Sequence, residues 1–315
     1  MENTDYDIIV VGGGVAGMTA GMYAASSGAR TIVLEKETLG GQISLANIVE
    51  NYPAVVGKPS GPEVAEGMRE QAEYFGAEIR TANATSIEAP EDSPVRTVQT
   101  SDGPLTAYAV VYAAGAHHRE LGVPGERELL GKGVSRCAYC DAFFFRGKDV
   151  VVVGGGNSAV TETLHLLHVC NSITLIHRRD ELRAEHYLQK RLMQMSENLT
   201  FRWNSVVESI NGEDEVTSVT IKDVNTGEKD EIPTEGVFIF IGFDPNSAMV
   251  KDLLETDEEG LVITDERMKT SVEGIYACGD VRNNFLRQMV VACGEGAIAA
   301  VAAQLYVQKL KGQDE

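Results

Sequence analysis

The sequence predicts an α/β protein with two Rossmann-like domains, and two observations lead to this prediction. The order strand, glycine-rich turn, helix, strand occurs near the N-terminus and returns 142 residues later, with its first glycine at Gly12 and again at Gly154. The chain has 315 residues, which is long enough for two domains. Hydrophobic residues make up 43% and charged residues 23%, the balance of a folded globular protein.

The first copy begins with an apolar run at residues 8–11, which is typical of a buried parallel strand. Its other parts follow in order: Gly12, Gly14 and Gly17, a helix at 15–26, a strand at 31–34, and Glu35. The first glycine allows a tight turn, the second lets the backbone approach a pyrophosphate, and the third lets helix and strand pack closely. The acid accepts hydrogen bonds from a ribose. We therefore predict dinucleotide binding; the alternative is a glycine-rich turn in a purely structural unit.

The second copy differs from the first at the position of the acid. Its parts are a strand at 150–153, Gly154, Gly156 and Ala159, a strand at 172–176, and then His177, Arg178, Arg179 and Arg183. His177 stands where the first copy has Glu35, and arginines attract the 2′-phosphate that an acid would repel. The pattern favours NADP(H) here and a dinucleotide without a 2′-phosphate at the first copy. The alternative is a solvated basic helix start. Two such sites in one chain imply electron transfer between a flavin and a nicotinamide.

A C-x-x-C pair, Cys137 and Cys140, stands directly before the second copy. A zinc site needs about four ligands, and neither the other cysteines nor the six histidines supply two more at ligand spacing, so we predict no metal. A pair of bystander thiols is a second alternative. We favour a redox dithiol, because two cysteines at this spacing can form a disulfide. Arg136 would promote the thiolate. Asp141 can exchange its proton; the alternative is that Asp141 is an N-cap or turn acid.

Composition limits the partners and the compartment. The chain carries 47 acidic residues against 27 Lys and Arg, a net charge of −20, which disfavours binding to nucleic acid or to an anionic membrane. We expect no secretory signal at the N-terminus and no apolar run long enough to span a membrane. Five cysteines, an odd number, do not form a disulfide framework in a chain of this size. These observations predict a cytoplasmic protein.

Six segments together resemble one family. In chain order they are "ISLANIVENYPAVVG", "LGVPGERELLGKGVSRCAYCD", "VVVVGGGNSAV", "HRRDELRAE", "GVFIFIGFDPN" and "GIYACGDVRNNFLRQMVVACGEGAIAA". On these motifs the chain is similar, essentially end to end, to the low-molecular-weight thioredoxin reductases of bacteria and archaea. The cysteine pair before the second glycine motif is their most diagnostic feature.

The resemblance implies FAD at the first copy, NADPH at the second, a thioredoxin or thioredoxin-like protein as partner, and a homodimer. The FAD residues it implies are Gly12, Gly14, Gly17, Glu35, Gly40, Gly41, Gln42, Asn51, Gly115, Gly279, Asp280, Arg287 and Gln288. The NADPH residues it implies are Gly154, Gly156, Asn157, Ser158, Ala159, His177, Arg178, Arg179 and Arg183. Because the implied FAD motifs lie at both ends, we expect the NADPH domain (118–245) to be inserted in the FAD domain (1–117 and 246–315).

The resemblance also implies a division of labour at the dithiol. Cys140 would face the flavin, Cys137 would attack the partner disulfide, and Asp141 would exchange protons. One domain would rotate against the other so that the disulfide and NADPH reach the flavin in turn. Each domain should combine a parallel sheet with an antiparallel excursion, and residues 201–233 predict a β-meander with a turn at "NTGE".

The chain departs from the family pattern at several positions. Tyr139 stands where Thr is common and Arg136 where Tyr is common, both next to the dithiol. Ala142 and Ala54 stand where Gly is frequent, and Cys293 where a small apolar residue is usual. The first two departures bear on partner preference and redox potential rather than on the class of reaction.

Four other functions compete with this interpretation. One is a flavin disulfide reductase that serves a glutaredoxin-like protein or a peroxidase system, although the fused reductases of that group carry an N-terminal thioredoxin-like module. Another is a ferredoxin–NADP reductase of similar shape, which lacks the C-x-x-C. A ferredoxin-fed thioredoxin reductase would tend to lose "HRRDELRA", which is intact here. A flavin-binding sensor would need neither the dithiol nor the arginine cluster.

Overall fold

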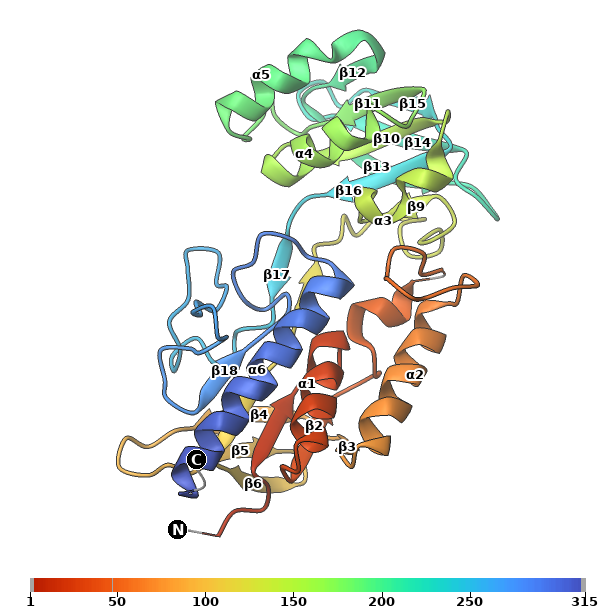
Figure 1. Cartoon of the computed structure of the whole chain (residues 1–315). Coiled ribbons are helices and arrows are strands. Elements are labelled where there is room, and N and C mark those ends of the chain that lie inside the picture. The colour runs from red at the N-terminus through yellow and green to blue at the C-terminus, as the bar shows by residue number, and fades with distance from the viewer. Residues whose placement is uncertain (1–2, 47, 313–315) are drawn as a thin grey trace. The chain divides into compact units, whose positions relative to one another are not determined.

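The computed structural model describes residues 3–46 and 48–312 and divides into two compact units. The first unit comprises Met1–His117 and Asp244–Glu315, and the second comprises His118–Phe243. The chain passes between them twice, through β8 (Ala116–His118) and β17 (Phe243–Pro245), and these two strands pair with each other. Figure 1 shows the chain in order from N to C.

The first unit is built on a parallel sheet of five strands in the order β18-β7-β1-β2-β3. The strands are β1 (Ile8–Val11), β2 (Thr31–Glu35), β3 (Glu78–Thr81), β7 (Ala109–Tyr112) and β18 (Ile275–Ala277). Every residue of β1 and β7 is buried, as expected of strands covered on both faces. The predicted strands at 8–11 and 31–34 are thereby confirmed.

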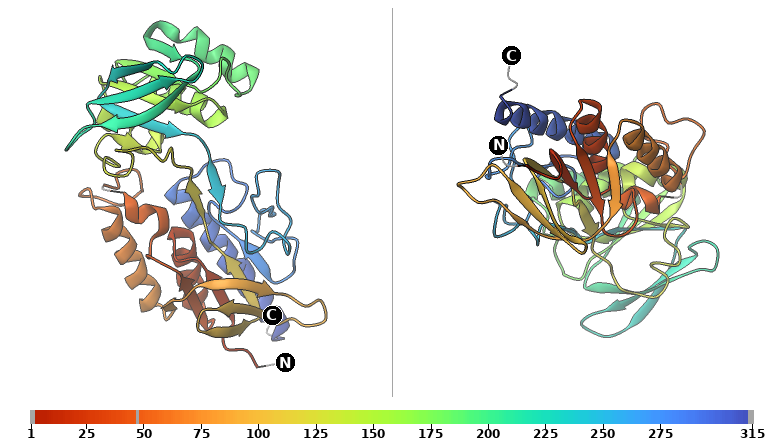
Figure 2. Two further views of the ribbon diagram at one scale, coloured as in Figure 1. Left: turned by 180° about the vertical axis from the view of Figure 1, so that it is seen from behind. Right: turned by 90° about the horizontal axis from the view of Figure 1, so that it is seen from below.

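Helices α1 (Val15–Ser26), α2 (Gly61–Tyr74) and α6 (Met289–Leu310) accompany this sheet, and Figure 2 shows them from two further sides. α1 and α6 pack closely because small side chains meet between them, including Ala20, Ala24 and Ala300. The other face of the sheet packs against Leu254, Val262 and the antiparallel sheet of β4 (Ala84–Glu88), β5 (Arg96–Thr100) and β6 (Gly103–Ala107). Lys311 pairs with Asp7 at 2.8 Å, so residues near the two ends of the chain meet in this unit.

One sequence expectation needs correction at α6. This helix of 22 residues is long and apolar enough, by length and composition, to cross a membrane, whereas the sequence analysis expected no such run. Its buried residues, among them Ala292, Ala299 and Ala303, belong to the core that includes Ile8 and Val10. A core helix against a sheet meets the same test of length and hydropathy, so the observation is weak evidence for a membrane span.

The second unit repeats the plan with a parallel sheet in the order β12-β11-β10-β16-β9. The strands are β9 (Val134–Ser135), β10 (Asp149–Gly154), β11 (Ser172–Ile176), β12 (Leu199–Arg202) and β16 (Gly236–Phe240). The helices are α3 (Ala138–Asp141), α4 (Asn157–Leu166) and α5 (His186–Gln194). Val152 and Leu175 face the core beneath α4, and Val151 and Ile176 face the core on the other side.

The predicted β-meander is present but shorter than expected. It consists of β13 (Ser205–Asn211), β14 (Ser218–Asp223) and β15 (Lys229–Pro233), paired antiparallel. The Asp223 carboxylate accepts from the N–H groups of Asn225 and Thr226 and so stabilises the predicted turn. Phe201 and Arg202, which were assigned to the meander, instead pair in parallel with β11.

Candidate dinucleotide and dithiol sites

Gly12 and Gly14 lie in the turn from β1 into α1, and Gly17 lies in the first turn of α1 itself. Gly12 has a φ of 110°, and a Cβ on it would overlap the carbonyl of Ala113. A Cβ on Gly17 would overlap the carbonyl oxygen of Gly12. A Cβ on Gly14 would meet only the Gly40 oxygen, 4.0 Å away. Protein packing thus requires glycine at 12 and 17, whereas at Gly14 the backbone faces open space in which a ligand can approach.

Glu35 lies at the end of β2, beside this turn. Its Oε2 accepts from the Gly13 N–H at 2.7 Å, and its Oε1 accepts from the Glu37 N–H at 3.0 Å. The two bonds hold the carboxylate next to the glycine turn, the position from which an acid in a Rossmann fold reaches a ribose.

The loop that contains Gly40, Gly41 and Gln42 meets the same turn. The Gly40 N–H donates to the Gly13 oxygen at 2.8 Å, and both Gly40 and Gly41 have positive φ. Gln42 follows in a short 3-10 helix, η1 (Gly41–Leu45).

Segments far apart in the sequence meet elsewhere in the first unit. The side chain of Asn51 donates to Gln288 Oε1 at 3.1 Å, across 237 positions of sequence. The oxygen of Gly115, which follows β7, accepts from the Asn246 N–H at 3.0 Å.

The last FAD residues implied by the resemblance follow β18 and form a polar cluster. The Gly279 N–H donates to Glu295 Oε2 at 2.8 Å, and Arg282 bonds Glu295 Oε1 at 2.6 Å. Burial raises the pKa of Asp280, and burial lowers the pKa of Arg287 while the nearby Asp280 opposes that shift. Arg282 and Glu295 were not predicted from the sequence, although an acid inside the apolar helix α6 was a signal that could have found them.

Asn284 is a third residue that was not predicted from the sequence. Its buried side-chain oxygen has no hydrogen-bond partner among residues 3–46 and 48–312. A buried acceptor without a partner is costly, so its presence beside Gly279 and Asp280 is consistent with a donor supplied by a ligand.

The second copy shows the same contrast among its glycines. Gly154 has a φ of 149° and approaches the Phe240 carbonyl, and a Cβ on Gly155 would overlap the His177 ring. Gly156 has a φ of −90°, and a Cβ on it would meet no atom within 4 Å. The middle glycine again faces open space at the start of α4. Asn157 and Ser158 are exposed in the first turn of that helix, and Ala159 is buried beneath it.

A loop at residues 177–185 carries the arginines and is fastened to this glycine turn. The Gly155 oxygen accepts from the N–H groups of Arg183 (2.8 Å) and Ala184 (3.1 Å), and Asn157 Oδ1 accepts from the Glu185 N–H at 2.8 Å. Arg178, Arg179 and Arg183 are all exposed on it.

His177 differs from the three arginines. It is buried, and burial together with the charges of Arg183, Arg179 and Arg178 lowers its pKa. Its ring packs against Gly155, so it supports the glycine turn from beneath rather than adding a fourth exposed cation.

Cys137 and Cys140 form a disulfide, with their Cα atoms 5.3 Å apart. Cys137 is the N-cap of α3, and its Sγ accepts from the Cys140 N–H at 3.1 Å. Asp141 ends the same short helix, and burial raises the pKa of its carboxyl, while the Ser135 hydroxyl, which donates to Oδ2 at 2.7 Å, opposes that shift. A carboxyl with a raised pKa beside a disulfide is suited to proton exchange with thiols.

The neighbours of the disulfide differ from the sequence expectation in one respect. Arg136 was predicted to promote the thiolate, but its guanidinium bonds the buried Glu126 at 3.1 Å and Glu120 at 3.4 Å. Two carboxylates therefore compensate its charge. Tyr139, one of the departures from the family pattern, stacks on His165 with ring centroids 4.5 Å apart.

Glu162, on α4, was not singled out from the sequence. Its Oε2 accepts from the Ala138 N–H at 2.8 Å, and the Tyr139 N–H also bonds to it. The carboxylate is thus joined to the two residues that follow Cys137.

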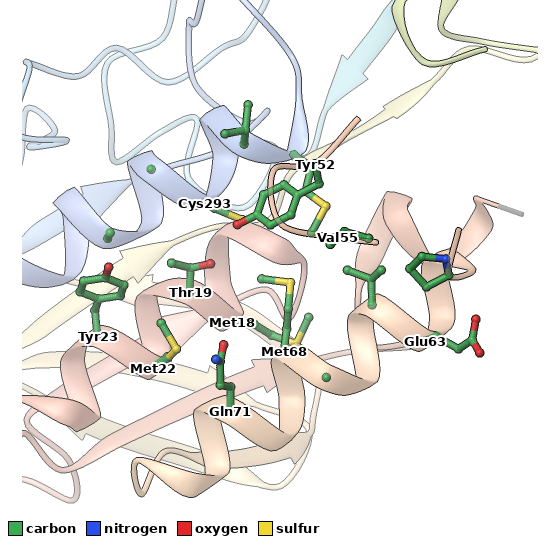
Figure 3. A pocket seen from close by; sticks show the side chains of 17 residues that line it. Met18, Thr19, Met22, Tyr23, Tyr52, Val55, Glu63, Met68, Gln71 and Cys293 are labelled. Carbon is green, nitrogen blue, oxygen red and sulfur yellow. The ribbon is translucent and has the colours of Figure 1, made fainter. Parts of the chain in front are cut away.

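A cavity of about 580 Å³ lies in the first unit among α1, α2, α6 and the loop around Tyr52 (Figure 3). Met18, Met22, Met68 and Cys293 are among the residues that line it, and none of the predicted site residues does. In the same loop Ala54 has a φ of 68°, in the left-handed region that favours glycine. Within the described part of the chain, no three His, Cys, Asp or Glu side chains are grouped to hold a metal ion.

The sequence matches the pyridine nucleotide-disulphide oxidoreductase family over residues 6–296. It is 46% identical over 308 residues to the thioredoxin reductase of Treponema pallidum (strain Nichols), covering 98% of this chain and 99% of that protein. It is 44% identical over 311 residues to the thioredoxin reductase of Bacillus subtilis (strain 168), covering 98% and 97%. The crystal structure of thioredoxin reductase from Streptococcus pyogenes MGAS5005 superposes with a TM-score of 0.92 at 43% identity, covering 98% of this chain and 100% of that one.

Proposed function

The chain belongs to the pyridine nucleotide-disulphide oxidoreductases and, within them, to the thioredoxin reductases, and from this we propose which of its residues carry the reaction. It is an NADPH-dependent flavoprotein that passes electrons through FAD to the Cys137–Cys140 pair and on to the disulfide of a thioredoxin. The observation that carries the assignment is the disulfide beside the half-buried Asp141, whose pKa burial raises. A glutaredoxin-like or peroxidase partner is not favoured, because the relatives are thioredoxin reductases.

We propose that the first unit, Met1–His117 and Asp244–Glu315, binds FAD; its second segment begins two residues before the predicted 246–315. The open space before Gly14, the fixed carboxylate of Glu35 and the unsatisfied oxygen of Asn284 support this proposal. When bound, FAD supplies a two-electron carrier between NADPH and the disulfide. Gly40, Gly41, Gln42, Asn51, Gly115, Gly279, Asp280, Arg287 and Gln288 complete the proposed site.

The second unit is proposed to bind NADPH. Gly156 leaves room for the pyrophosphate at the start of α4, together with Asn157 and Ser158. The exposed guanidinium groups of Arg178, Arg179 and Arg183 are proposed to hold the 2′-phosphate. His177 is proposed to act from beneath, by fixing the position of Gly155 and of the arginine loop.

At the dithiol the two sulfurs have different proposed roles. The Cys137 thiolate attacks one sulfur of the partner disulfide and forms a mixed disulfide, and one partner thiol leaves. Cys140 then attacks the Cys137 sulfur, which re-forms the Cys137–Cys140 disulfide and releases the second partner thiol. Asp141 supplies and accepts the protons, and NADPH provides the two electrons of each turnover.

Single cysteine variants test this division of labour. We expect Cys137→Ser and Cys140→Ser to lose thioredoxin reduction by a factor of a thousand or more, because each removes one half of the exchange. Both should still oxidise NADPH with an artificial electron acceptor. Cys140→Ser should also trap a thioredoxin as a stable mixed disulfide through Cys137, which mass spectrometry detects. Cys170→Ser, which removes a buried free thiol of the same unit, is the control and should retain activity. Substantial thioredoxin reduction by either C-x-x-C variant would refute the dithiol mechanism.

We further propose that the protein is a homodimer that works in the cytoplasm and binds neither nucleic acid nor membrane. Val290, Ile298, Val301 and Leu305 are exposed apolar residues at helical spacing along α6, with exposed Tyr23 on the neighbouring helix α1. An apolar face of this kind supports association with a second copy of the chain. The buried free thiols of Cys170, Cys278 and Cys293 suit a reducing compartment.

A further inference from the structure

The carboxylate of Glu162 occupies two backbone donors next to the reactive disulfide, while a third, the Cys140 N–H, donates to Cys137 Sγ. Glu162 lies half-buried in α4, and Ala138 and Tyr139, whose N–H groups it accepts, directly follow Cys137. Glu162 takes no part in the proposed reaction. Its contact with the dithiol segment belongs wholly to the second unit.

Backbone N–H groups near a cysteine sulfur normally favour the thiolate, because their partial positive charges stabilise it. Here Glu162 takes up two of these donors, and its carboxylate brings a negative charge next to Ala138, the residue that follows Cys137. Burial raises the pKa of this carboxyl, and the N–H groups of Ala138 and Tyr139 oppose that shift by stabilising the ionised form. The occupied donors and the negative charge both oppose ionisation of the Cys137 thiol. A dithiol whose thiolate is disfavoured is less stable when reduced, and it therefore gives up its electrons more readily.

The other charged groups near the pair do not offset this effect. Arg136 is compensated by Glu126 and Glu120. His165 stacks on Tyr139, and burial, with a smaller contribution from the nearby His168, lowers the pKa of the ring and so disfavours its cationic form. Asp141 is an acid whose pKa burial raises, so when ionised it adds to the negative field rather than cancelling it. Within the described residues, no Lys or Arg forms an ion pair with Glu162.

We propose that Glu162 is a positioning residue that fixes the first turn of α3 and, by its charge, keeps the Cys137 thiol poorly acidic, which makes the reduced pair a stronger reductant. The inference rests on the proposed role of Cys137 as nucleophile. It concerns the acidity of that thiol, which is measured without a thioredoxin. Its failure is therefore distinguishable from failure of the proposed function.

The test titrates Cys137 in full-length protein with Cys140→Ser, which leaves Cys137 as a free thiol. The rate of alkylation by iodoacetamide is followed against pH, and mass spectrometry of the Cys137 peptide separates it from the other cysteines. We expect Glu162→Gln to increase the acid dissociation constant of Cys137 about tenfold, because the amide keeps an acceptor but removes the charge. Glu162→Asp, whose carboxylate is one methylene further away, should give a smaller increase.

Glu208→Gln is the matched control, since it removes a carboxylate elsewhere in the second unit, on β13. It should leave the acid dissociation constant of Cys137 unchanged. An unchanged or less acidic Cys137 in folded Glu162→Gln would overturn the proposal. If Glu162→Gln does not fold, Glu162→Asp decides, because an unchanged acidity there also overturns it.

Discussion

Gly12, Gly14 and Gly17 are glycines for different reasons, and the difference separates folding from binding. Gly12 and Gly17 have no room for a Cβ because backbone carbonyls stand in its place. At Gly14 the protein leaves space, and only a ligand that approaches the backbone closely would be excluded by a side chain. The same distinction holds for Gly154 and Gly156 in the second unit.

At this scale we predict that Gly14→Ala folds but loses FAD, whereas Gly17→Ala is destabilised by about 1–3 kcal/mol or more through overpacking. The measurements are FAD per chain from the absorption spectrum and the circular dichroism of the apoprotein. Gly67→Ala is the control, because Gly67 also has open space around its Cβ position but lies on α2, away from the glycine turn. A Gly14→Ala protein that purifies with full FAD content would disprove the assignment.

The loop at 177–185 is an element whose conformation follows from its attachment rather than from regular secondary structure. Its backbone N–H groups donate to Gly155, and Asn157 holds Glu185. The glycine turn and the arginine cluster therefore form one body, in which a pyrophosphate site and a 2′-phosphate site lie at a fixed separation.

We predict that Arg178→Ala combined with Arg183→Ala raises the Michaelis constant for NADPH at least tenfold more than that for NADH. Each lost charge-assisted hydrogen bond costs about 1.5–3 kcal/mol, and only NADPH has the phosphate that makes it. Steady-state kinetics with both nucleotides provides the measurement. Arg191→Ala, an exposed arginine on α5, is the control and should affect both nucleotides little. Equal increases for NADH and NADPH would contradict the 2′-phosphate role.

For the whole molecule, the exposed apolar residues of α6 bear on the oligomeric state. Residues 290, 298, 301 and 305 recur at helical spacing, on the helix whose other side packs in the core of the first unit. The net charge of −20 makes copies of the chain repel one another and so disfavours nonspecific association. The apolar face of α6 therefore favours a specific contact with a second copy.

We predict that Val301→Glu weakens the dimer at least tenfold in its dissociation constant, because the contact would bury a carboxylate that has no partner. Sedimentation velocity across a concentration series measures this. Val224→Glu is matched in exposure, 48% against 45% for Val301, but lies in the second unit and should leave the dimer intact. A dimer that survives Val301→Glu at full strength would show that α6 is not the interface.

The sequence by itself determined the two dinucleotide units, the position of the dithiol and the exchange of an acid for arginines between the copies. Each of these features depends only on residues close together in the sequence: an apolar run, glycines at fixed intervals, or two cysteines three positions apart. Strands 8–11, 31–34 and 172–176 form as predicted, because a buried parallel strand needs a short continuous apolar run. The limits of the β-meander and the apolar length of α6 were predicted wrongly, because both depend on what the segment packs against.

Only the tertiary structure decided which side chains meet across the sequence. Asn51 contacts Gln288, Glu295 holds Gly279 and Arg282, and no local pattern encodes either pairing. It also reversed the expectation for Arg136, whose charge is compensated by Glu126 ten positions earlier. Glu162 reached the dithiol because α4 packs beside α3, although the two residues it bonds lie 24 and 23 positions away. Charge and hydrogen bonding act through space, so the electrostatics of the site follow from the packing of its elements.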